Sequence, residues 1–122
     1  MEMKLLIVED NAEMRRLIIS IVGDLADSIV ECEDGAEALV CYAEFQPDLV
    51  LMDIKMAQVD GITASRQIIA AFPNARICIV TDYSDRETRE TARNAGVADY
   101  VTKEHLFELR TIIGNLPAAQ AN

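Results

Sequence analysis

The feature that most constrains this chain is a run of four apolar residues that ends in an acid, Leu49-Val50-Leu51-Met52 followed by Asp53. An unbroken apolar run of this length is typical of an interior strand in a parallel sheet, because helices cover both faces of such a sheet. Asp53 then lies at the carboxyl edge of the sheet, where open α/β sheets bind their ligands. The run therefore predicts a buried central strand with a carboxylate at its functional edge.

Two further apolar runs and two weaker ones alternate with stretches of helical periodicity. The strands are expected at about 5–8, 28–32, 49–52, 77–80 and 99–102, and a helical stretch follows each of them. This alternation predicts an α/β fold, a doubly wound five-stranded parallel sheet with right-handed crossovers and five helices on two faces. We expect one domain over residues 1–122, with a core at about 3–116 and a C-terminal tail at 117–122.

The composition limits the kinds of binding partner that we expect and indicates the cellular compartment. The chain has 21 acidic and 11 basic residues and a net charge of -10, which disfavours contact with nucleic acid and anionic membranes and favours cations and basic partners. No signal peptide or long apolar span is recognisable, so we expect a cytoplasmic protein. Cys32, Cys41 and Cys78 lack a C-x-x-C spacing and are expected to be buried thiols in a reducing compartment.

Two stretches have the pattern of a capping box at the start of a helix, Asp34-Gly35-Ala36-Glu37 and Ser84-Asp85-Arg86-Glu87. The helix after the second box has a single apolar residue, Ala92, before Asn94. With so little apolar surface to bury, this helix is expected to be the least stably docked in the domain.

Four of the predicted strands end in polar residues, Glu9-Asp10, Asp53, Thr81 and Lys103. Because the carboxyl ends of parallel strands share one edge, these side chains are expected to converge. Three carboxylates repel one another unless a cation lies between them, and hard oxygen ligands suit Mg²⁺. One carboxylate can then act as a nucleophile towards phosphorus, while the lysine and the threonine hydroxyl neutralise phosphoryl oxygens.

At these residues the sequence resembles a response-regulator receiver domain of two-component signalling, with the chemotaxis-regulator type of fold. The resemblance covers the chain to about Leu116 and rests on a set of motifs in a fixed order: Val8-Glu9-Asp10-Asn11, Asp34-Gly35, Pro47 to Asp53, Asp60-Gly61, Thr81, Ala95-Gly96 and Asp99 to Lys103. It implies a flavodoxin-like sheet with strand order 2-1-3-4-5.

The resemblance also implies a site centred on Asp53, which would take a phosphoryl group from a phosphohistidine of a sensor histidine kinase or phosphotransfer protein. Glu9, Asp10 and Asp53 would bind Mg²⁺ as cofactor, together with the backbone carbonyl of Lys55. Catalysis would be limited to the domain's own phosphorylation and dephosphorylation, so the chain is not expected to be an enzyme in the usual sense.

Three further positions have roles in this family. Thr81 and Lys103 would contact the phosphoryl oxygens. Phosphorylation would draw Thr81 inward, and Tyr100 would swing into the vacated space. The surface of the fourth helix, fifth strand and fifth helix would then change its preference for a partner or for a homodimer.

The residues two beyond the acceptor and two beyond the threonine, Lys55 and Tyr83, are expected to set the lifetime of the phosphorylated form. The sequence departs from the usual family pattern at Ala57, Asp82 and Glu104. Asp82 adds a carboxylate near the site, and it could disfavour an incoming phosphoryl group or alter metal affinity.

Three alternative functions remain open from the residues alone. An aspartate-nucleophile phosphatase would need a second aspartate at position 55, which is lysine, and a flavin-binding module would need a Ser/Thr/Gly-rich loop where Glu9-Asp10-Asn11 stands. A receiver-like module that binds partners without phosphorylation is kept open by Asp82. Nothing after Leu116 resembles a DNA-binding domain, so we expect either a stand-alone receiver or a receiver without its output domain.

Overall fold

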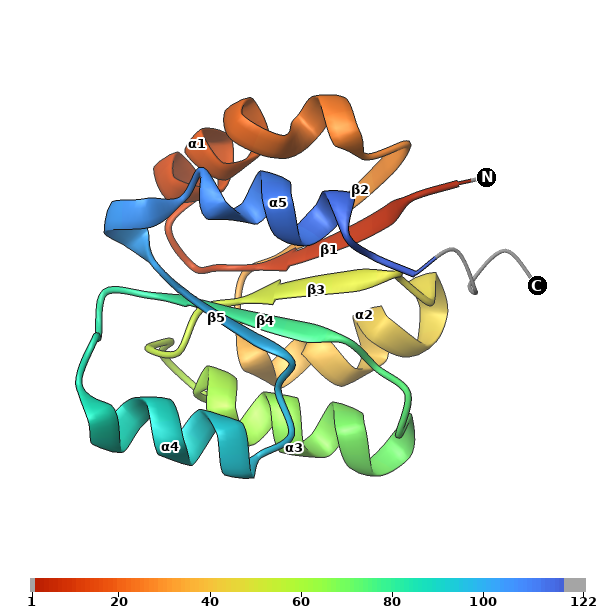
Figure 1. The fold of residues 1–122 in the computed structure, drawn as a ribbon. Helices are drawn as coiled ribbons and strands as arrows, with labels where there is room; N and C mark the ends of the chain where they lie inside the picture. Colours follow the sequence, from red (N-terminus) through yellow and green to blue (C-terminus); the bar gives the residue numbers. More distant parts are fainter. Residues whose placement is uncertain (1, 118–122) are drawn as a thin grey trace.

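The apolar runs form the strands of a single parallel sheet in the computed structural model, which describes residues 2–117 (Figure 1). The strands are β1 (Lys4–Val8), β2 (Ser28–Cys32), β3 (Leu49–Met52), β4 (Ile77–Thr81) and β5 (Asp99–Thr102). Their order in the sheet is β2-β1-β3-β4-β5, and every neighbouring pair is parallel. The predicted fold class and strand order are therefore confirmed.

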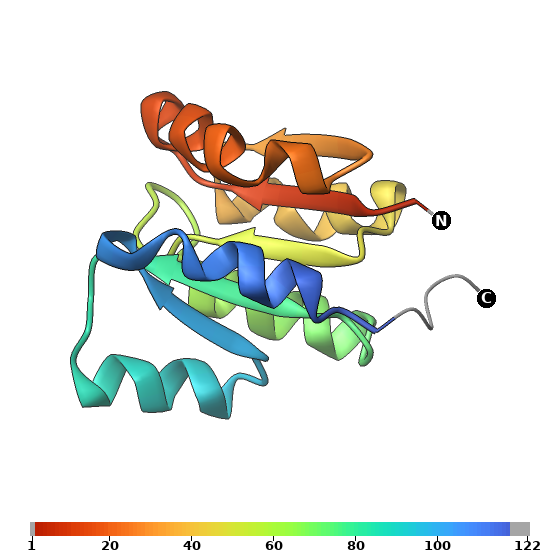
Figure 2. The same cartoon turned by 45° about the horizontal axis from the view of Figure 1, so that its top comes forward.

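Helices cover both faces of this sheet, as the alternation in the sequence predicted. They are α1 (Ala12–Val22), α2 (Ala38–Phe45), α3 (Gly61–Ala71), α4 (Arg86–Asn94) and α5 (Glu108–Gly114). Short 3₁₀ turns occupy Gly23–Leu25, Gly35–Glu37 and Lys103–His105. Figures 1 and 2 show α1 and α5 together on one face, with α2, α3 and α4 on the other.

The unbroken apolar runs are explained by burial on both faces of the sheet. Alternate residues of β1 and β3 pack into two separate clusters, one beneath α1 and α5 and one beneath α2, α3 and α4. Leu5 and Leu49 belong to the first cluster, Leu6 and Val50 to the second, and all four are fully buried. A strand with this environment has no face that tolerates a polar side chain, so polar residues are displaced to its ends.

Two helix starts differ from the capping boxes expected from the sequence. Helix α4 is capped by Asp85, whose carboxylate accepts from the Thr88 amide at 2.9 Å, so the prediction of a box starting at Ser84 was wrong by one residue. Aspartate caps well because it adds a negative charge at the positive end of the helix dipole. Asp34 accepts from the Ala36 amide as expected, but it caps a 3₁₀ turn, and α2 begins only at Ala38.

No helix among residues 2–117 is long and apolar enough to cross a membrane. Cys32, Cys41 and Cys78 are free thiols; Cys32 and Cys78 are buried and Cys41 is half-buried. The predicted tail lies outside the described residues except for Pro117.

Candidate functional site

The polar strand ends meet at the carboxyl edge of the sheet, as predicted. Oxygens of Glu9, Asp10 and Asp53 all lie within 4.8 Å of one another. Glu9 and Asp53 are buried, with 2% and 6% of their surface exposed, whereas Asp10 is exposed. The register explains this convergence, since Val8 pairs with Met52 and the next residue of each strand is an acid.

Lys103 brings a positive charge to the two buried carboxylates. It opens the 3₁₀ turn that follows β5, and only 12% of its side chain is exposed. Its Nζ lies 3.0 Å from Glu9 Oε1 and 3.4 Å from Asp53 Oδ1. One ammonium is therefore shared between two carboxylates that water reaches poorly.

The pKa values of the site residues reflect the sharing of one positive charge between two buried carboxylates. Burial raises the pKa of Glu9 to about 7, and the Asp53 carboxylate adds to the rise while Lys103 opposes it. Burial also raises the pKa of Asp53, against the opposing effect of Lys103. Burial by itself would lower the pKa of Lys103, but its contacts with Glu9 and Asp53 outweigh that effect and raise it. Perturbed pKa values that cluster in one cleft are typical of functional sites.

The three carboxylates fit a divalent cation. Glu9 Oε2 accepts from the Asn11 amide at 3.1 Å, whereas Glu9 Oε1, although close to Lys103, makes no well-directed hydrogen bond to any described residue. A buried carboxylate oxygen is costly unless positive charge satisfies it, and the ammonium beside Glu9 Oε1 is shared with Asp53. Several oxygen ligands and one exposed carboxylate leave room for coordinated water, which Mg²⁺ retains in protein sites.

The segment that follows β4 is linked to Tyr100 of β5 and, through it, to α4. Thr81 is buried, and its Oγ1 accepts from the Tyr83 amide at 3.2 Å. The Tyr100 hydroxyl donates to the Tyr83 carbonyl at 2.7 Å, and the Arg89 guanidinium of α4 lies 4.6 Å from the centre of the Tyr100 ring. Thr81, Tyr100 and α4 thus form one connected set of contacts.

Two other residues singled out in the sequence lie outside the buried part of the site. Lys55 and Asp82 are both exposed. The charge of Asp82 contributes to raising the pKa of Lys103, so Asp82 is near enough to influence the site. The role of the Lys55 carbonyl as a ligand stays a prediction.

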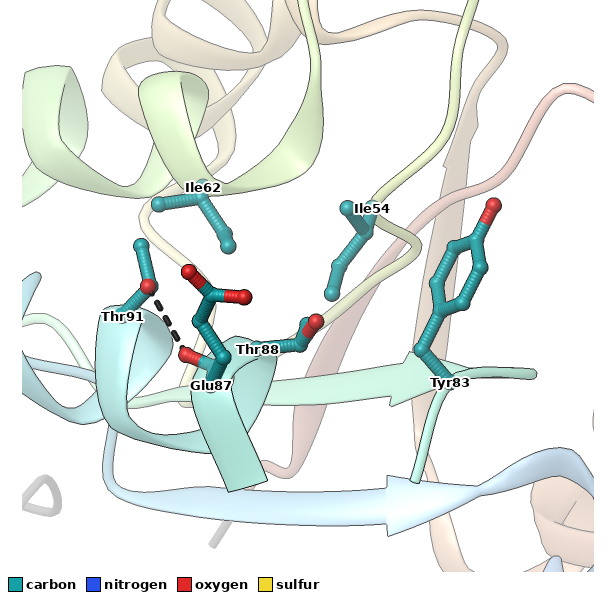
Figure 3. A pocket seen from close by; sticks show the side chains of 6 residues that line it. All are labelled: Ile54, Ile62, Tyr83, Glu87, Thr88 and Thr91. Carbon is teal, nitrogen blue, oxygen red and sulfur yellow. Dashed lines mark hydrogen bonds between the residues drawn. The ribbon is translucent and has the colours of Figure 1, made fainter. Parts of the chain in front are cut away.

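An open cleft of about 290 Å³ separates α4 from α3 and from the loop after Asp53 (Figure 3). It is lined by Ile54, Ile62, Tyr83, Glu87, Thr88 and Thr91. Within α4 only Ala92 is buried, and Thr88 and Thr91 are half-buried. The helix that the sequence predicted to be weakly docked therefore buries little of its surface.

Sequence reasoning missed two residues that shape the loop between β3 and α3. Asp34, for which the sequence indicated only a capping contact, also accepts from the Gln58 and Val59 amides, both at 3.0 Å. At Gly61 an added Cβ would lie 1.8 Å from the Asp53 carbonyl oxygen, so only glycine allows this approach. The only signal for these contacts in the sequence was an Asp-Gly pair at each position, Asp34-Gly35 and Asp60-Gly61. Such pairs more often mark simple turns.

Comparison with known proteins agrees with this geometry. The model of the response regulator receiver domain family matches residues 5–113. The chemotaxis protein CheY of Bacillus subtilis is 39% identical over 101 residues, which cover 82% of this chain and 84% of that protein. The response regulator domain of Thermotoga maritima CheB has a crystal structure that matches with a TM-score of 0.85 and 28% identity over 95% of this chain and 96% of that one.

A longer relative shares the same region. The uncharacterized transcriptional regulatory protein YhcZ of Bacillus subtilis is 36% identical in an alignment of 119 positions that covers 92% of this chain but 55% of that protein. The chain thus spans about half the length of this relative. From the family match, the identity to CheY and the shared fold, the chain belongs to the response regulator receiver domain family.

Proposed function

We propose that this receiver domain is a phosphorylation-controlled switch in which Asp53 accepts a phosphoryl group from a sensor histidine kinase or a phosphotransfer protein. The observation that carries the proposal is the grouping of Glu9, Asp10 and Asp53 within 4.8 Å, with Lys103 Nζ 3.4 Å from Asp53 Oδ1. An acidic cluster that lacks positive charge, beside a lysine that can reach a phosphoryl oxygen, suits phosphoryl transfer to a carboxylate.

Phosphoryl transfer to Asp53 mainly requires that the donor is held in position and that the negative charge of the phosphoryl oxygens is neutralised. Glu9, Asp10 and Asp53 would hold Mg²⁺, with the Lys55 carbonyl as a further ligand, and the bound ion would supply positive charge to the carboxylates and the phosphoryl oxygens. A carboxylate oxygen of Asp53 attacks phosphorus, and the phosphorus–nitrogen bond of the donor phosphohistidine breaks as the imidazole leaves. The Lys103 ammonium then pairs with one phosphoryl oxygen.

The switch would begin at Thr81. If its hydroxyl turns to donate to a phosphoryl oxygen, its present contact with the Tyr83 amide at 3.2 Å is lost. Tyr100 is bonded to the Tyr83 carbonyl and lies beneath Arg89 of α4, so a shift at Thr81 would reach α4 through these contacts. The weakly buried α4 is suited to a two-state movement. The surface of α4, β5 and α5 would then select an output partner or a second copy of the chain.

Intact mass spectrometry after incubation with acetyl phosphate and Mg²⁺ tests this proposal. One added phosphoryl group is expected on the native chain and on Asp82→Ala, which removes a neighbouring exposed carboxylate, but not on Asp53→Ala. Addition to Asp53→Ala would mean that another residue is the acceptor. No addition from acetyl phosphate or phosphoramidate, although Mg²⁺ binding is measured, would favour a partner-binding module that acts without phosphorylation.

A further inference from the structure

The loop that follows the phosphoacceptor, residues 54–60, contains no proline, so its shape depends on contacts with the rest of the domain. The carboxylate of Asp34 supplies contacts to the middle of this loop. Asp34 Oδ1 accepts from the amides of Ala36 at 2.9 Å and Val59 at 3.0 Å, and Oδ2 accepts from the amide of Gln58 at 3.0 Å. One buried side chain thus joins the turn after β2 to a loop 24 and 25 residues further along the chain.

The backbones of the turn and the loop also touch directly. A Cβ added to the buried Gly35 would lie 2.4 Å from the Val59 carbonyl oxygen, so the two segments approach as closely as backbones can. Just before this turn, the Cys32 carbonyl accepts from the Glu9 amide at 2.9 Å. The end of β2 is therefore bonded to Glu9, and the turn that follows it contacts the loop at Val59.

The ends of the loop are fixed by other contacts. The Gly61 amide donates to the Ile54 carbonyl at 2.7 Å, and Gly61 packs against the Asp53 carbonyl. With its ends closed in this way, the remaining freedom of the loop lies in its middle, where Asp34 bonds to it. The bonds are charge-assisted, since the Ala36, Gln58 and Val59 amides lower the pKa of Asp34 and keep it ionised at neutral pH.

We propose that Asp34 is a positioning residue for the phosphoacceptor site: it holds the loop after Asp53 in the conformation that the metal and the phosphoryl group require. This inference rests on the proposed function. Asp34 itself does not touch the reacting atoms. Its loss would leave two loop amides without acceptors and allow the loop to move, so that binding the ion would first require ordering the loop.

Two substitutions separate this role from helix capping. Asp34→Ser keeps a side-chain oxygen that can cap the turn at Ala36 but is too short to reach the Gln58 and Val59 amides. Asp34→Asn keeps the length and one acceptor oxygen, while its amide nitrogen faces a backbone N–H. The matched control is Asp48→Asn, because Asp48 Oδ2 accepts from the Lys4 amide at 2.8 Å at the opposite edge of the sheet.

The first measurement is the Mg²⁺ concentration that gives half the maximal rate of phosphorylation by acetyl phosphate. We expect it to rise about 10-fold in Asp34→Ser and less in Asp34→Asn, since outer contacts of a metal site typically contribute this much. Asp48→Asn should stay within about twofold of the native value, although all three variants lose some stability. A purely structural role for Asp34 would lower stability without moving the half-saturating Mg²⁺ concentration.

Two readouts keep the inference separate from the proposed function. Calorimetric titration of Mg²⁺ into each protein needs no phosphorylation, so a native chain that binds the ion but is never phosphorylated would refute the proposed function alone. Hydrogen exchange of the Gln58 and Val59 amides should accelerate in Asp34→Asn and not in Asp48→Asn. Equal Mg²⁺ affinity and equal loop exchange in Asp34→Asn and Asp48→Asn, with both folded by circular dichroism, would overturn the positioning role.

Discussion

The buried Glu9 should make the metal-free domain less stable as pH rises through the neutral range. Its pKa is raised from 4.5 to about 7, so between these values the folded protein holds a proton that the unfolded chain has released. The free energy of unfolding therefore falls with pH across this window. A shift of about 2.5 units corresponds to a loss of about 3 kcal/mol.

Other groups do not obscure this trend. The raised pKa of Asp53 acts in the same direction. The stability contributed by Lys103 is lost only above its unfolded pKa of about 10.4, and that of Asp34, whose pKa is lowered, is lost only below about pH 4. Between pH 5 and 8 the buried Glu9 carboxylate therefore dominates the pH dependence.

Urea denaturation in EDTA at pH 5, 6, 7 and 8 measures the effect. With a slope of about 2 kcal/mol per M, a loss of about 3 kcal/mol lowers the midpoint by about 1.5 M. Glu9→Gln, which is neutral and has the same shape, should remove most of this dependence, and the matched variant Glu13→Gln on the exposed start of α1 should keep it. Under the proposed function, saturating Mg²⁺ should oppose the loss, because the ion would bind the deprotonated carboxylates and stabilise the folded state that holds them. A native midpoint that rises between pH 5 and 7, or equal slopes for Glu9→Gln and Glu13→Gln, would refute the reasoning.

Three further outcomes are expected. Gly61→Ala should cost about 3 kcal/mol or more in urea denaturation, because the new methyl group would overlap the Asp53 carbonyl, and a loss below about 1 kcal/mol would contradict the packing. Amide protons of α4 should exchange faster than those of α1, since α4 buries only Ala92, and equal protection would show that α4 is as firmly docked. Exchanging Lys55 and Tyr83 together for other residues should change the half-life of the phosphorylated protein, measured by loss of the added mass, and an unchanged half-life would contradict their role.

The arrangement of the strands followed from the sequence because its signals are local. Each apolar run is unbroken, so its burial on both faces could be read without knowing its neighbours, and a polar residue directly after a run had to lie at the edge of the sheet. Glu9, Asp53 and Thr81 were placed by that reasoning alone. The order of the strands was not local information and came from the resemblance to the receiver family.

The sequence could not show which residues hold the loop after Asp53. Asp34 lies in a capping pattern, and its contact with Ala36 is the local one that such a pattern predicts. Its bonds to Gln58 and Val59 depend on how β2 and β3 lie relative to each other, on either side of β1, and nothing in the composition of either segment indicates them. Contacts of high sequence separation between two polar loops leave no periodic pattern.

The sequence also could not show which acidic residues belong to the site and which are satisfied by backbone amides. A chain with 21 acidic residues has many more carboxylates than one site uses, and in the sequence Asp34, Asp53 and Asp85 each stand beside a strand end or a helix start. The structure separates them by the donors that surround them. Backbone amides lower the pKa of Asp34 and Asp85, so the charges of these two anions are already satisfied within the fold. Burial raises the pKa of Asp53, because the Lys103 ammonium that it shares with Glu9 offsets the effect of burial only in part, so Asp53 still requires positive charge. Glu9 shares this condition with Asp53, and two neighbouring acids that remain short of positive charge in the folded domain are the ones that the proposed function assigns to the cation.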